Sequence, residues 1–250
     1  MNTEQLIGII FTLIFGAAFG SFATLFAYRL PRNESCFGRY FGPKSRCHNC
    51  GTTIITRDLI PIINWLITRG KCRSCNYQIS RIHLFVELTT VLLFLLCYYQ
   101  FGITEKFIIY SLVCTSLVII MASDFTHKIF PNQALLFILF FAGADRILRE
   151  NTILDMAISG TFGIFMVIIL HNLIYVKYKH IFANEQQFFS YAKFLLLASA
   201  VLNLENFLFY CFILVFALFA VFKAVKPVKP ISFGYIFIIP FICLTIISPL

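Results

Sequence analysis

The sequence predicts an all-α polytopic membrane protein with about eight transmembrane helices and a small cytoplasmic four-Cys domain between the first two. Two observations on composition support this class. Of the 250 residues, 60% are hydrophobic and only 12% are charged, with a mean hydropathy of +0.86. Soluble domains carry about 25% charged residues, and a soluble core of this size could not bury so much apolar surface. In addition, apolar runs of helical length recur along the whole chain.

The apolar runs define the expected helices. They cover residues 5–28, 83–101, 107–123, 132–147, 152–176, 193–204, 206–222 and 231–249. The run at 193–204 is short for a span of about 20 residues, so this helix is expected to be tilted or to extend backwards through FFSYAK. The first run lacks the basic start of a signal peptide. We therefore expect it to remain as a membrane helix with its N-terminus outside.

Positive charge is concentrated between the first two helices. Residues 29–81 hold ten Lys and Arg against two acidic residues, so +8 of the net charge of +9 lies there. In a membrane protein this pattern indicates a cytoplasmic loop, and that interpretation is favoured over nucleic-acid binding. The expected division is a first helix (1–28), a basic cytoplasmic domain (29–82) and a membrane domain of about seven helices (83–250). Arg146 and Arg149 fall on the outer side of this topology, against the rule.

Four of the nine cysteines lie in the basic domain as two C-x2-C pairs. Cys47 and Cys50 form the first pair, Cys72 and Cys75 the second, and 21 residues separate the pairs. Two residues between thiolates allow a tight turn to point both sulfurs at one ion, and four thiolates suit Zn²⁺. A reducing cytoplasm disfavours disulfides, and a redox or metal-free role is the alternative. Because Cys fills all four positions, the ion is expected to be structural.

The segment between the Cys pairs, DLIPIINWLITRG, is apolar enough to lie against the membrane surface. It contains Trp65, the only Trp of the chain. A Trp suits the headgroup region of a bilayer, and packing inside the four-Cys domain is the alternative.

Two of the acidic residues in or next to apolar runs are candidates for a functional role. Asp124 ends the third run, and KIFPN turns the chain back after it, while Glu87 lies just inside the second run. Carboxylates in such places are functional candidates; the alternatives are a surface position for Asp124 and pairing with a loop Arg for Glu87. If Asp124 serves an aspartic hydrolase, it needs a second carboxyl. One member then activates water while the other, protonated, assists the carbonyl.

Four stretches of the sequence match one known family. They are GSFATLFAYRLPR, the long stretch from PKSRCHNCG to HLFVELTT, SDFTHKIFPN and ISFGYIFIIPF. Through them the chain resembles the type IV prepilin leader peptidases, which are aspartic membrane peptidases that also N-methylate their product. The resemblance is dense over residues 20–90, clear at 124–132 and thin beyond. It implies that Asp124 is the first catalytic Asp.

The resemblance also implies a second catalytic Asp in a Gly-x-Gly-Asp motif, and this motif is absent. Alignment on Lys193 places Tyr191 at the Asp position, with Phe188 and Ser190 where the glycines belong. A Tyr hydroxyl, with a pKa near 10, cannot be the ionised partner at neutral pH, but it can hydrogen-bond Asp124. The nearest acid in the expected loop is Glu185, six residues before Tyr191.

The implied function is processing of pilin-like precursors for type IV pili or protein secretion. The enzyme would cleave the basic leader at the cytoplasmic face of the bacterial inner membrane, then methylate the new N-terminus with S-adenosylmethionine. The expected partners are pilin-like or pseudopilin precursor helices and the lipid bilayer, with no nucleic acid. Tyr191 motivates the alternative, a catalytically degenerate homologue that binds pilin-like helices or only methylates. A transporter using Asp124 and Glu87 ranks lower, because no inverted repeat is visible.

Overall fold

The computed structural model describes residues 2–36, 45–47, 49–148, 153–224 and 232–247. Their regular structure is helical apart from two isolated β-bridges, which confirms the predicted all-α class. The chain forms two compact units, Met1–Ala122 and Ser123–Leu250, and the boundary falls within helix α4 (Glu105–His127). Each unit is described by itself.

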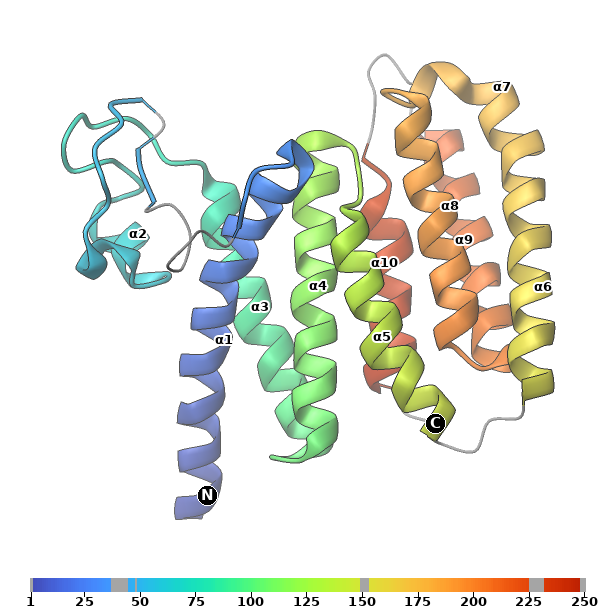
Figure 1. The fold of residues 1–250 in the computed structure, drawn as a ribbon, viewed down its shortest axis with the longest axis horizontal. Coiled ribbons are helices and arrows are strands. Elements are labelled where there is room, and N and C mark those ends of the chain that lie inside the picture. The colour runs from blue at the N-terminus through green and yellow to red at the C-terminus, as the bar shows by residue number, and fades with distance from the viewer. Residues whose placement is uncertain (1, 37–44, 48, 149–152, 225–231, 248–250) are drawn as a thin grey trace. The chain divides into compact units, whose positions relative to one another are not determined.

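The first unit is built on a long helix pair. It contains α1 (Thr3–Arg29), η1 (Leu30–Arg32), η2 (Thr56–Leu59), α2 (Ile63–Ile67), α3 (Arg81–Phe101) and most of α4. Helices α1 and α3 pack against each other along their length (Figure 1). Gly8, Gly16 and Gly20 make this possible, since a Cβ atom on Gly20 would lie only 2.9 Å from the Cα atom of Glu87. Small residues allow membrane helices to approach this closely.

A Gly20→Ala substitution is expected to lower the thermal stability of the protein in detergent. In a helix interior, Gly→Ala ordinarily stabilises by about 1 kcal/mol. At Gly20 the added methyl group would meet the α3 backbone, and overpacking of this kind costs about 1–3 kcal/mol. Gly160→Ala is the matched control, because a Cβ atom there meets nothing within 4 Å. A melting temperature that rises equally in both variants would contradict this account of the helix contact.

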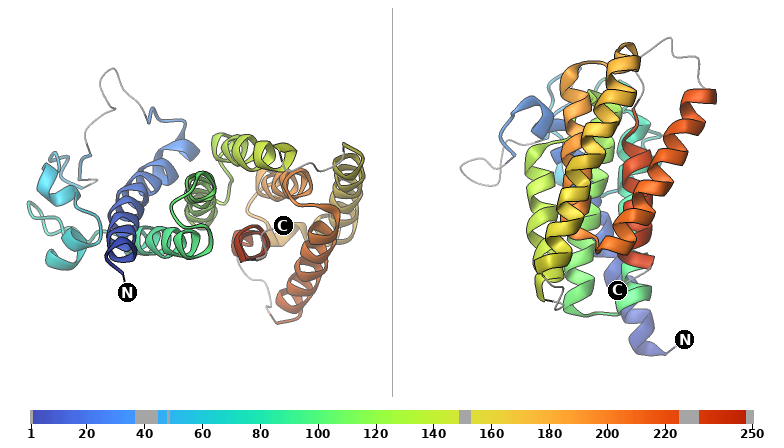
Figure 2. Two further views of the ribbon diagram at one scale, coloured as in Figure 1. Left: turned by 90° about the horizontal axis from the view of Figure 1, so that it is seen from below. Right: turned by 90° about the vertical axis from the view of Figure 1, so that its right-hand side faces the viewer.

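The second unit surrounds a central helix, α8. It contains α5 (Asn132–Leu148), α6 (Ile153–Leu170), a π-helical turn (His171–Tyr175), α7 (Val176–Tyr178), η4 (Lys179–Ile181), α8 (Glu185–Val201), α9 (Leu204–Ala224), α10 (Gly234–Ile242) and a second π-helical turn (Cys243–Ile247). Helix α8 contacts α5, α6, α9 and α10, as the end-on view of Figure 2 shows. Many side chains on α8, Gln187 and Tyr191 among them, are therefore buried in the interior of this unit.

Helix α8 begins earlier than the apolar run predicts. Its first residue is Glu185, so the expected backward extension through FFSYAK is confirmed and Tyr191 lies inside a helix. Part of the segment 177–192, expected as a loop, is therefore helical. The start is fixed by Asn184, whose side chain accepts a hydrogen bond of 2.8 Å from the Gln187 N–H. An Asn in this position satisfies one of the unpaired amides of a helix start.

Four helical segments are long and apolar enough to cross a membrane, in the part of the chain that the structure describes: Thr3–Arg32, Arg81–Phe101, Glu105–His127 and Leu154–Tyr175. Two shorter apolar helices, Leu204–Leu218 and Gly234–Ile246, accompany them. The chain is accordingly a membrane protein, and eight crossings stay a prediction.

Arg146, whose predicted position on the outer side goes against the positive-inside rule, pairs with an acidic side chain inside the second unit. Its side chain is buried, with Nη2 2.7 Å from Asp155 Oδ2 and Nη1 3.0 Å from the Ser199 carbonyl oxygen. A paired charge of this kind says little about which side of the membrane it occupies. Arg149 lies outside the described residues.

Candidate active site and metal centre

Asp124 lies at the junction of three elements of the second unit. It belongs to the last turn of α4, and only 1% of its surface is exposed. Its Oδ1 atom accepts a hydrogen bond of 2.8 Å from the Tyr191 hydroxyl on α8. Its Oδ2 atom accepts one of 2.8 Å from the N–H of Gly234, the first residue of α10. The amide at a helix start is a favourable partner for an anion, so this arrangement suits an ionised carboxylate.

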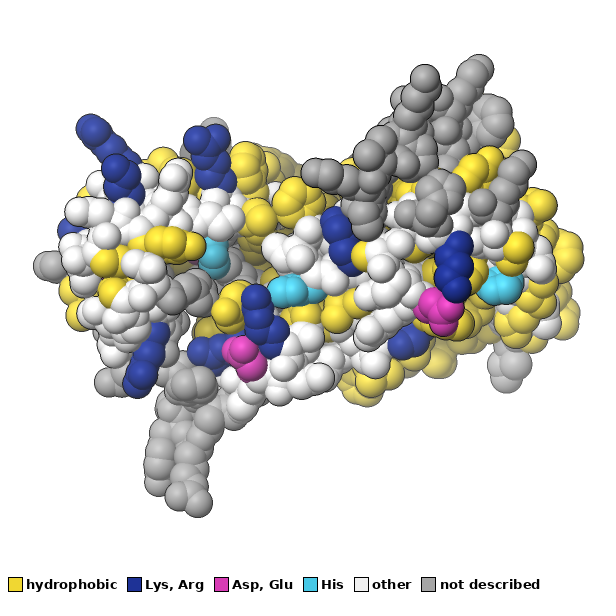
Figure 3. Space-filling model, turned by 90° about the horizontal axis from the view of Figure 1, so that it is seen from above, with side chains coloured by type: hydrophobic (Ala, Val, Ile, Leu, Met, Phe, Trp, Pro, Cys, Tyr) yellow, Lys and Arg dark blue, Asp and Glu magenta, His cyan; other side chains and the backbone are white. Residues whose placement is uncertain are grey.

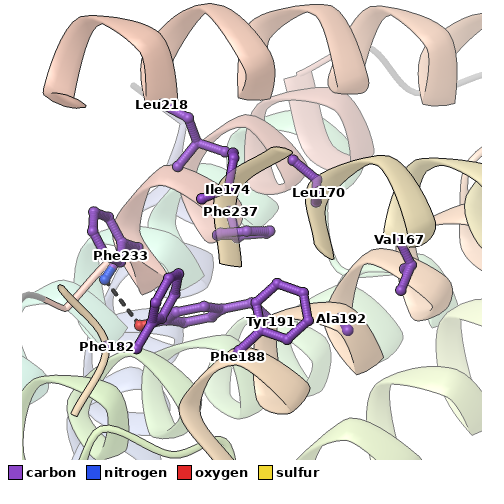
Figure 4. Close-up of a pocket in the computed structure, with 10 residues that line it drawn as sticks. All are labelled: Val167, Leu170, Ile174, Phe182, Phe188, Tyr191, Ala192, Leu218, Phe233 and Phe237. Atoms are coloured by element: carbon purple, nitrogen blue, oxygen red, sulfur yellow. Dashed lines mark hydrogen bonds between the residues drawn. The ribbon is translucent and has the colours of Figure 1, made fainter. Parts of the chain in front are cut away.

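Tyr191 is oriented so that its hydroxyl proton points to Asp124. The hydroxyl oxygen accepts hydrogen bonds from Gln187 Nε2 (2.8 Å) and from the Phe233 N–H (3.0 Å; Figure 4). The Tyr191 ring stacks on Phe237, with centroids 5.0 Å apart and planes inclined by 12°. A hydroxyl group has one proton and two lone pairs. With both lone pairs accepting, the proton is left for Asp124, as the predicted hydrogen bond requires.

Two residues of this site were not assigned a role from sequence. Gly234 brings its backbone against the carboxylate, and a Cβ atom there would lie 2.8 Å from Asp124 Oδ2. In the sequence, the Gly of ISFGYIFIIPF was the signal that could have identified this close contact. Gln187 precedes Tyr191 by four residues, which places both side chains on one face of a helix. That spacing was visible in the sequence once the helix was known to start before Gln187.

Glu185 does not partner Asp124. Its side chain is 63% exposed and pairs with Lys179, 2.9 Å away. The hydrogen bond and charge of Lys179 lower the pKa of Glu185. Among the residues with described positions, no carboxylate contacts Asp124, whose two oxygens are taken by Tyr191 and Gly234. The site therefore offers one carboxylate base and one hydroxyl that is protonated at neutral pH.

The Tyr191 ring also forms part of the wall of an apolar pocket (Figure 4). Its wall comes from α6, the following π-helical turn, α8, α9 and the start of α10. The lining residues are Val167, Leu170, Ile174, Phe182, Phe188, Tyr191, Ala192, Leu218, Phe233 and Phe237. Phe188 occupies one of the positions where the resemblance expects Gly. Bulky aromatic side chains thus fill space near the position expected to hold the second Asp.

The four predicted cysteines come together in the first unit. The Sγ atoms of Cys47, Cys50, Cys72 and Cys75 all lie within 4.8 Å of one another, and those of Cys47 and Cys75 are 3.7 Å apart. A tetrahedral zinc site with Zn–S bonds of about 2.3 Å places its sulfurs about 3.8 Å apart. The sulfurs therefore fit a single tetrahedral ion, and the cluster could hold a metal.

Each Cys pair is held by its own backbone turn. The Cys47 N–H bonds to the Thr52 carbonyl (3.0 Å), the Cys72 N–H bonds to the Tyr77 carbonyl (2.9 Å), and an isolated β-bridge flanks each pair. The Thr52 hydroxyl, 3.3 Å from the Cys50 sulfur, and the Thr52 backbone lower the pKa of Cys50 to about 6. Backbone amides of Cys75 and Ser74 lower the pKa of Cys72. A thiolate, the form that binds metal, is thus favoured at one Cys of each turn. At Cys75 the hydrogen bond with the Tyr77 backbone lowers the pKa, but burial and the neighbouring Cys50 and Cys47 thiols outweigh it and raise the pKa to about 11.

Glu87 has a structural partner in the four-Cys domain, although the partner is not an Arg. Its Oε2 atom accepts a hydrogen bond of 2.7 Å from the Ile62 N–H. Ile62 is the centre of a γ-turn with φ of +62°, closed by the Ile63 N–H and the Pro61 carbonyl. This backbone conformation is unfavourable for a β-branched residue. The hydrogen bond to Glu87 therefore holds a strained turn of the domain against α3.

The Trp65 ring packs against Gly70 inside the four-Cys domain, as the alternative interpretation of this side chain expects, while its neighbours Ile63, Leu66 and Ile67 remain exposed. A Cβ atom on Gly70 would lie 2.7 Å from the Trp65 ring, and Gly70 has a φ of +67°. The Trp65 Nε1 atom is buried. The close approach requires Gly at position 70.

Comparison with known proteins gives a consistent set of relatives. Residues 14–101 match the family described as "Bacterial Peptidase A24 N-terminal domain". The chain is 33% identical over 150 residues to "Prepilin leader peptidase/N-methyltransferase" of Bacillus subtilis (strain 168), covering 60% of this chain and 58% of the relative. It is 36% identical over 123 residues to the protein of that name from Myxococcus xanthus (strain DK1622), covering 49% and 35%.

A third relative of the same name, from Vibrio cholerae serotype O1 (strain ATCC 39315 / El Tor Inaba N16961), is 29% identical over 182 residues, or 69% of this chain and 70% of the relative. The chain thus spans only 58% and 35% of the length of the first two relatives. No solved structure matches the chain.

Proposed function

Because residues 14–101 match a peptidase A24 N-terminal family and the chain is similar to several prepilin leader peptidases, we propose that it belongs to that family and processes pilin-like precursors as a membrane-bound aspartic endopeptidase. It cleaves the basic leader at the cytoplasmic face of the inner membrane and then methylates the new N-terminus. The observation that supports a retained site is Asp124, which the resemblance assigns to the first catalytic position and which is held by Tyr191 and Gly234. S-adenosylmethionine is proposed as the methyl donor on the resemblance alone.

In the proposed reaction, Asp124 acts as the base and Tyr191 as the hydrogen-bond donor, the two roles that a pair of carboxyl groups has in an aspartic peptidase. The Asp124 carboxylate takes a proton from water as the water attacks the scissile carbonyl. The Tyr191 hydroxyl turns its hydrogen bond from Asp124 to the developing oxyanion and stabilises it. Asp124 then returns the proton to the leaving amine nitrogen. Because Asp124 is 1% exposed and Tyr191 is 3% exposed, substrate binding must open this site.

A Tyr191→Phe substitution tests this assignment and is expected to slow leader cleavage by about 10²-fold. The ring keeps its stacking on Phe237, while the hydrogen-bond donor to Asp124 and to the oxyanion is lost. The measurement is cleavage of a pilin precursor by purified protein in detergent, followed by mass spectrometry. Unchanged cleavage with Phe at position 191 would show that the hydroxyl has no catalytic role.

A second candidate function is favoured by the same contact. The closed network around Asp124 also suits a catalytically degenerate homologue that binds pilin-like helices or methylates them without proteolysis. The discriminating assay incubates the parent protein with a pilin precursor beside an Asp124→Asn variant. Cleavage by the parent alone eliminates the degenerate function. Methylation of a pre-cut substrate without any leader cleavage eliminates the first proposal, and a gain of cleavage in Tyr191→Asp would then identify the missing acid.

The four-Cys cluster is proposed to hold one structural Zn²⁺. Cys47, Cys50, Cys72 and Cys75 would bind it, which leaves no position open for a catalytic water. The support is the compact set of four sulfurs and the lowered pKa of Cys50 and Cys72. The ion's contribution is to fix the fold of the domain, which is too small to form a core of its own. The concentrated positive charge supports a cytoplasmic position for this domain.

A further inference from the structure

The four-Cys domain exposes a set of large apolar side chains between its Cys pairs. Each has between 42% and 66% of its surface exposed, and together they form what we call the apolar surface: Ile55, Leu59, Ile60, Ile63, Leu66 and Ile67. Three of them lie on α2, within five consecutive residues. Large apolar side chains gathered in one short segment indicate a surface that is covered by a partner.

The hydrogen bond from Ile62 to Glu87 fixes the height of this surface along α3. Glu87 is the seventh residue of α3, so it lies about 9 Å along the axis from Arg81. Helix α3 is one of the four segments apolar enough to span a membrane. The turn that starts α2 is thus held beside the second turn of a membrane helix (Figure 1). Where α3 crosses a bilayer, a segment at this height lies at the edge of the bilayer and not out in the solvent.

The charges next to the apolar surface suit the same environment. Arg69 and Lys71 follow α2 directly, Arg81 begins α3, and all three side chains are exposed. The acidic residue of this segment, Asp58, is paired with Arg73 at 2.8 Å. Figure 3 shows several exposed Lys and Arg side chains on the part of the molecule that holds the four-Cys domain. Basic side chains at the rim of an apolar surface complement anionic lipid headgroups.

We propose that the apolar surface inserts into the boundary between headgroups and acyl chains, with Arg69 and Lys71 against anionic headgroups. The four-Cys domain is then a monotopic attachment beside the α1–α3 helix pair. A bilayer is favoured over a protein partner because the Glu87 contact places the surface at membrane height in the protein alone. The inference does not depend on whether Asp124 and Tyr191 catalyse cleavage.

The single Trp of the chain provides the test. Trp65 lies on α2 between Asn64 and Leu66, so its fluorescence reports the surroundings of this segment alone. The full chain is reconstituted in vesicles of phosphatidylcholine and phosphatidylglycerol with bromine atoms near the carbonyl end of the acyl chains. Quenching of Trp65 is expected, and it should exceed the quenching by bromine near the chain ends. A triple variant, Ile63→Ser, Leu66→Ser and Ile67→Ser, should reduce quenching about twofold or more.

The matched control exchanges Ile63→Leu, Leu66→Ile and Ile67→Leu, which keeps the surface apolar and should keep the quenching. Since these side chains are exposed, neither set removes core packing, and an unchanged Trp65 emission maximum in detergent verifies the local fold. Two results would overturn the proposal. One is the absence of quenching in vesicles, or quenching that needs added pilin-like peptide. The other is equal quenching in the Ser and the conservative variants.

Discussion

Replacing Asp124 by Asn is expected to abolish leader cleavage, with a fall in rate of about 10³-fold or more. The carboxylate is the only base that the described residues place against the Tyr191 hydroxyl, and an amide cannot take a proton from water. The amide also fits its surroundings poorly. The carboxylate accepts from both Tyr191 and Gly234, whereas an Asn side chain has one acceptor and turns a donor towards one of these two donors.

The control for this experiment is Glu185→Gln. Glu185 is exposed and paired with Lys179, so its neutralisation should leave cleavage within about twofold of the parent. Size-exclusion and thermal unfolding in detergent verify that the Asn variant is folded. Cleavage that survives in Asp124→Asn would contradict the assignment of the base. Cleavage that is lost in Glu185→Gln would show that the first turn of α8 rearranges to bring in this acid.

Replacing Cys72 by Ser is expected to abolish binding of the proposed Zn²⁺ and to unfold the four-Cys domain. Structural zinc contributes about 10–16 kcal/mol to small domains of this kind, more than such a domain gains from its own core. The measurements are elemental analysis of the purified protein and limited proteolysis between residues 45 and 80. The variant should carry no zinc and be cut rapidly, while the parent carries one equivalent and resists.

Cys243→Ser is the control for the metal experiment. Cys243 is exposed and belongs to the second unit, far along the chain from the four clustered sulfurs. It should retain the zinc and the protease resistance of the parent. A folded parent protein that contains no metal would exclude the zinc proposal, because four clustered thiols alone would then be sufficient for the fold.

The sequence predicts the helices well where the apolar runs are uninterrupted. Runs at 83–101 and 132–147 correspond closely to α3 (Arg81–Phe101) and α5 (Asn132–Leu148). The apolar run of α8 itself begins only at residue 193, and the sequence predicted the earlier part of the helix only as an extension through FFSYAK, because polar residues interrupt the run. The fold buries one of them, Gln187, completely and satisfies it: Nε2 donates to Tyr191 and Oε1 accepts from the Ala183 N–H. A hydropathy pattern cannot anticipate a polar side chain that is paired inside the unit.

The candidate site, like the helices, was predicted from the sequence only in part. Side-chain identity and family spacing were sufficient to bring Asp124 and Tyr191 together, and to group the four cysteines. The contacts made by backbone amides were not predicted: Gly234 to Asp124, Phe233 to Tyr191, and Ile62 to Glu87. Every residue except Pro carries the same amide group, so the residue types give no signal for such contacts. Only the tertiary fold selects which amide meets which side chain.

The bond between Glu87 and Ile62 has a thermodynamic consequence for the metal. The same residue, Glu87, meets the four-Cys domain through its carboxylate and faces Gly20 of α1 through its backbone. Folding of the domain around an ion and close packing of α1 on α3 therefore share one residue. Two equilibria that share a contact influence each other reciprocally. Metal affinity should thus fall when the helix pair is loosened, and the helix pair should become less stable, by the same free energy, when the metal is removed.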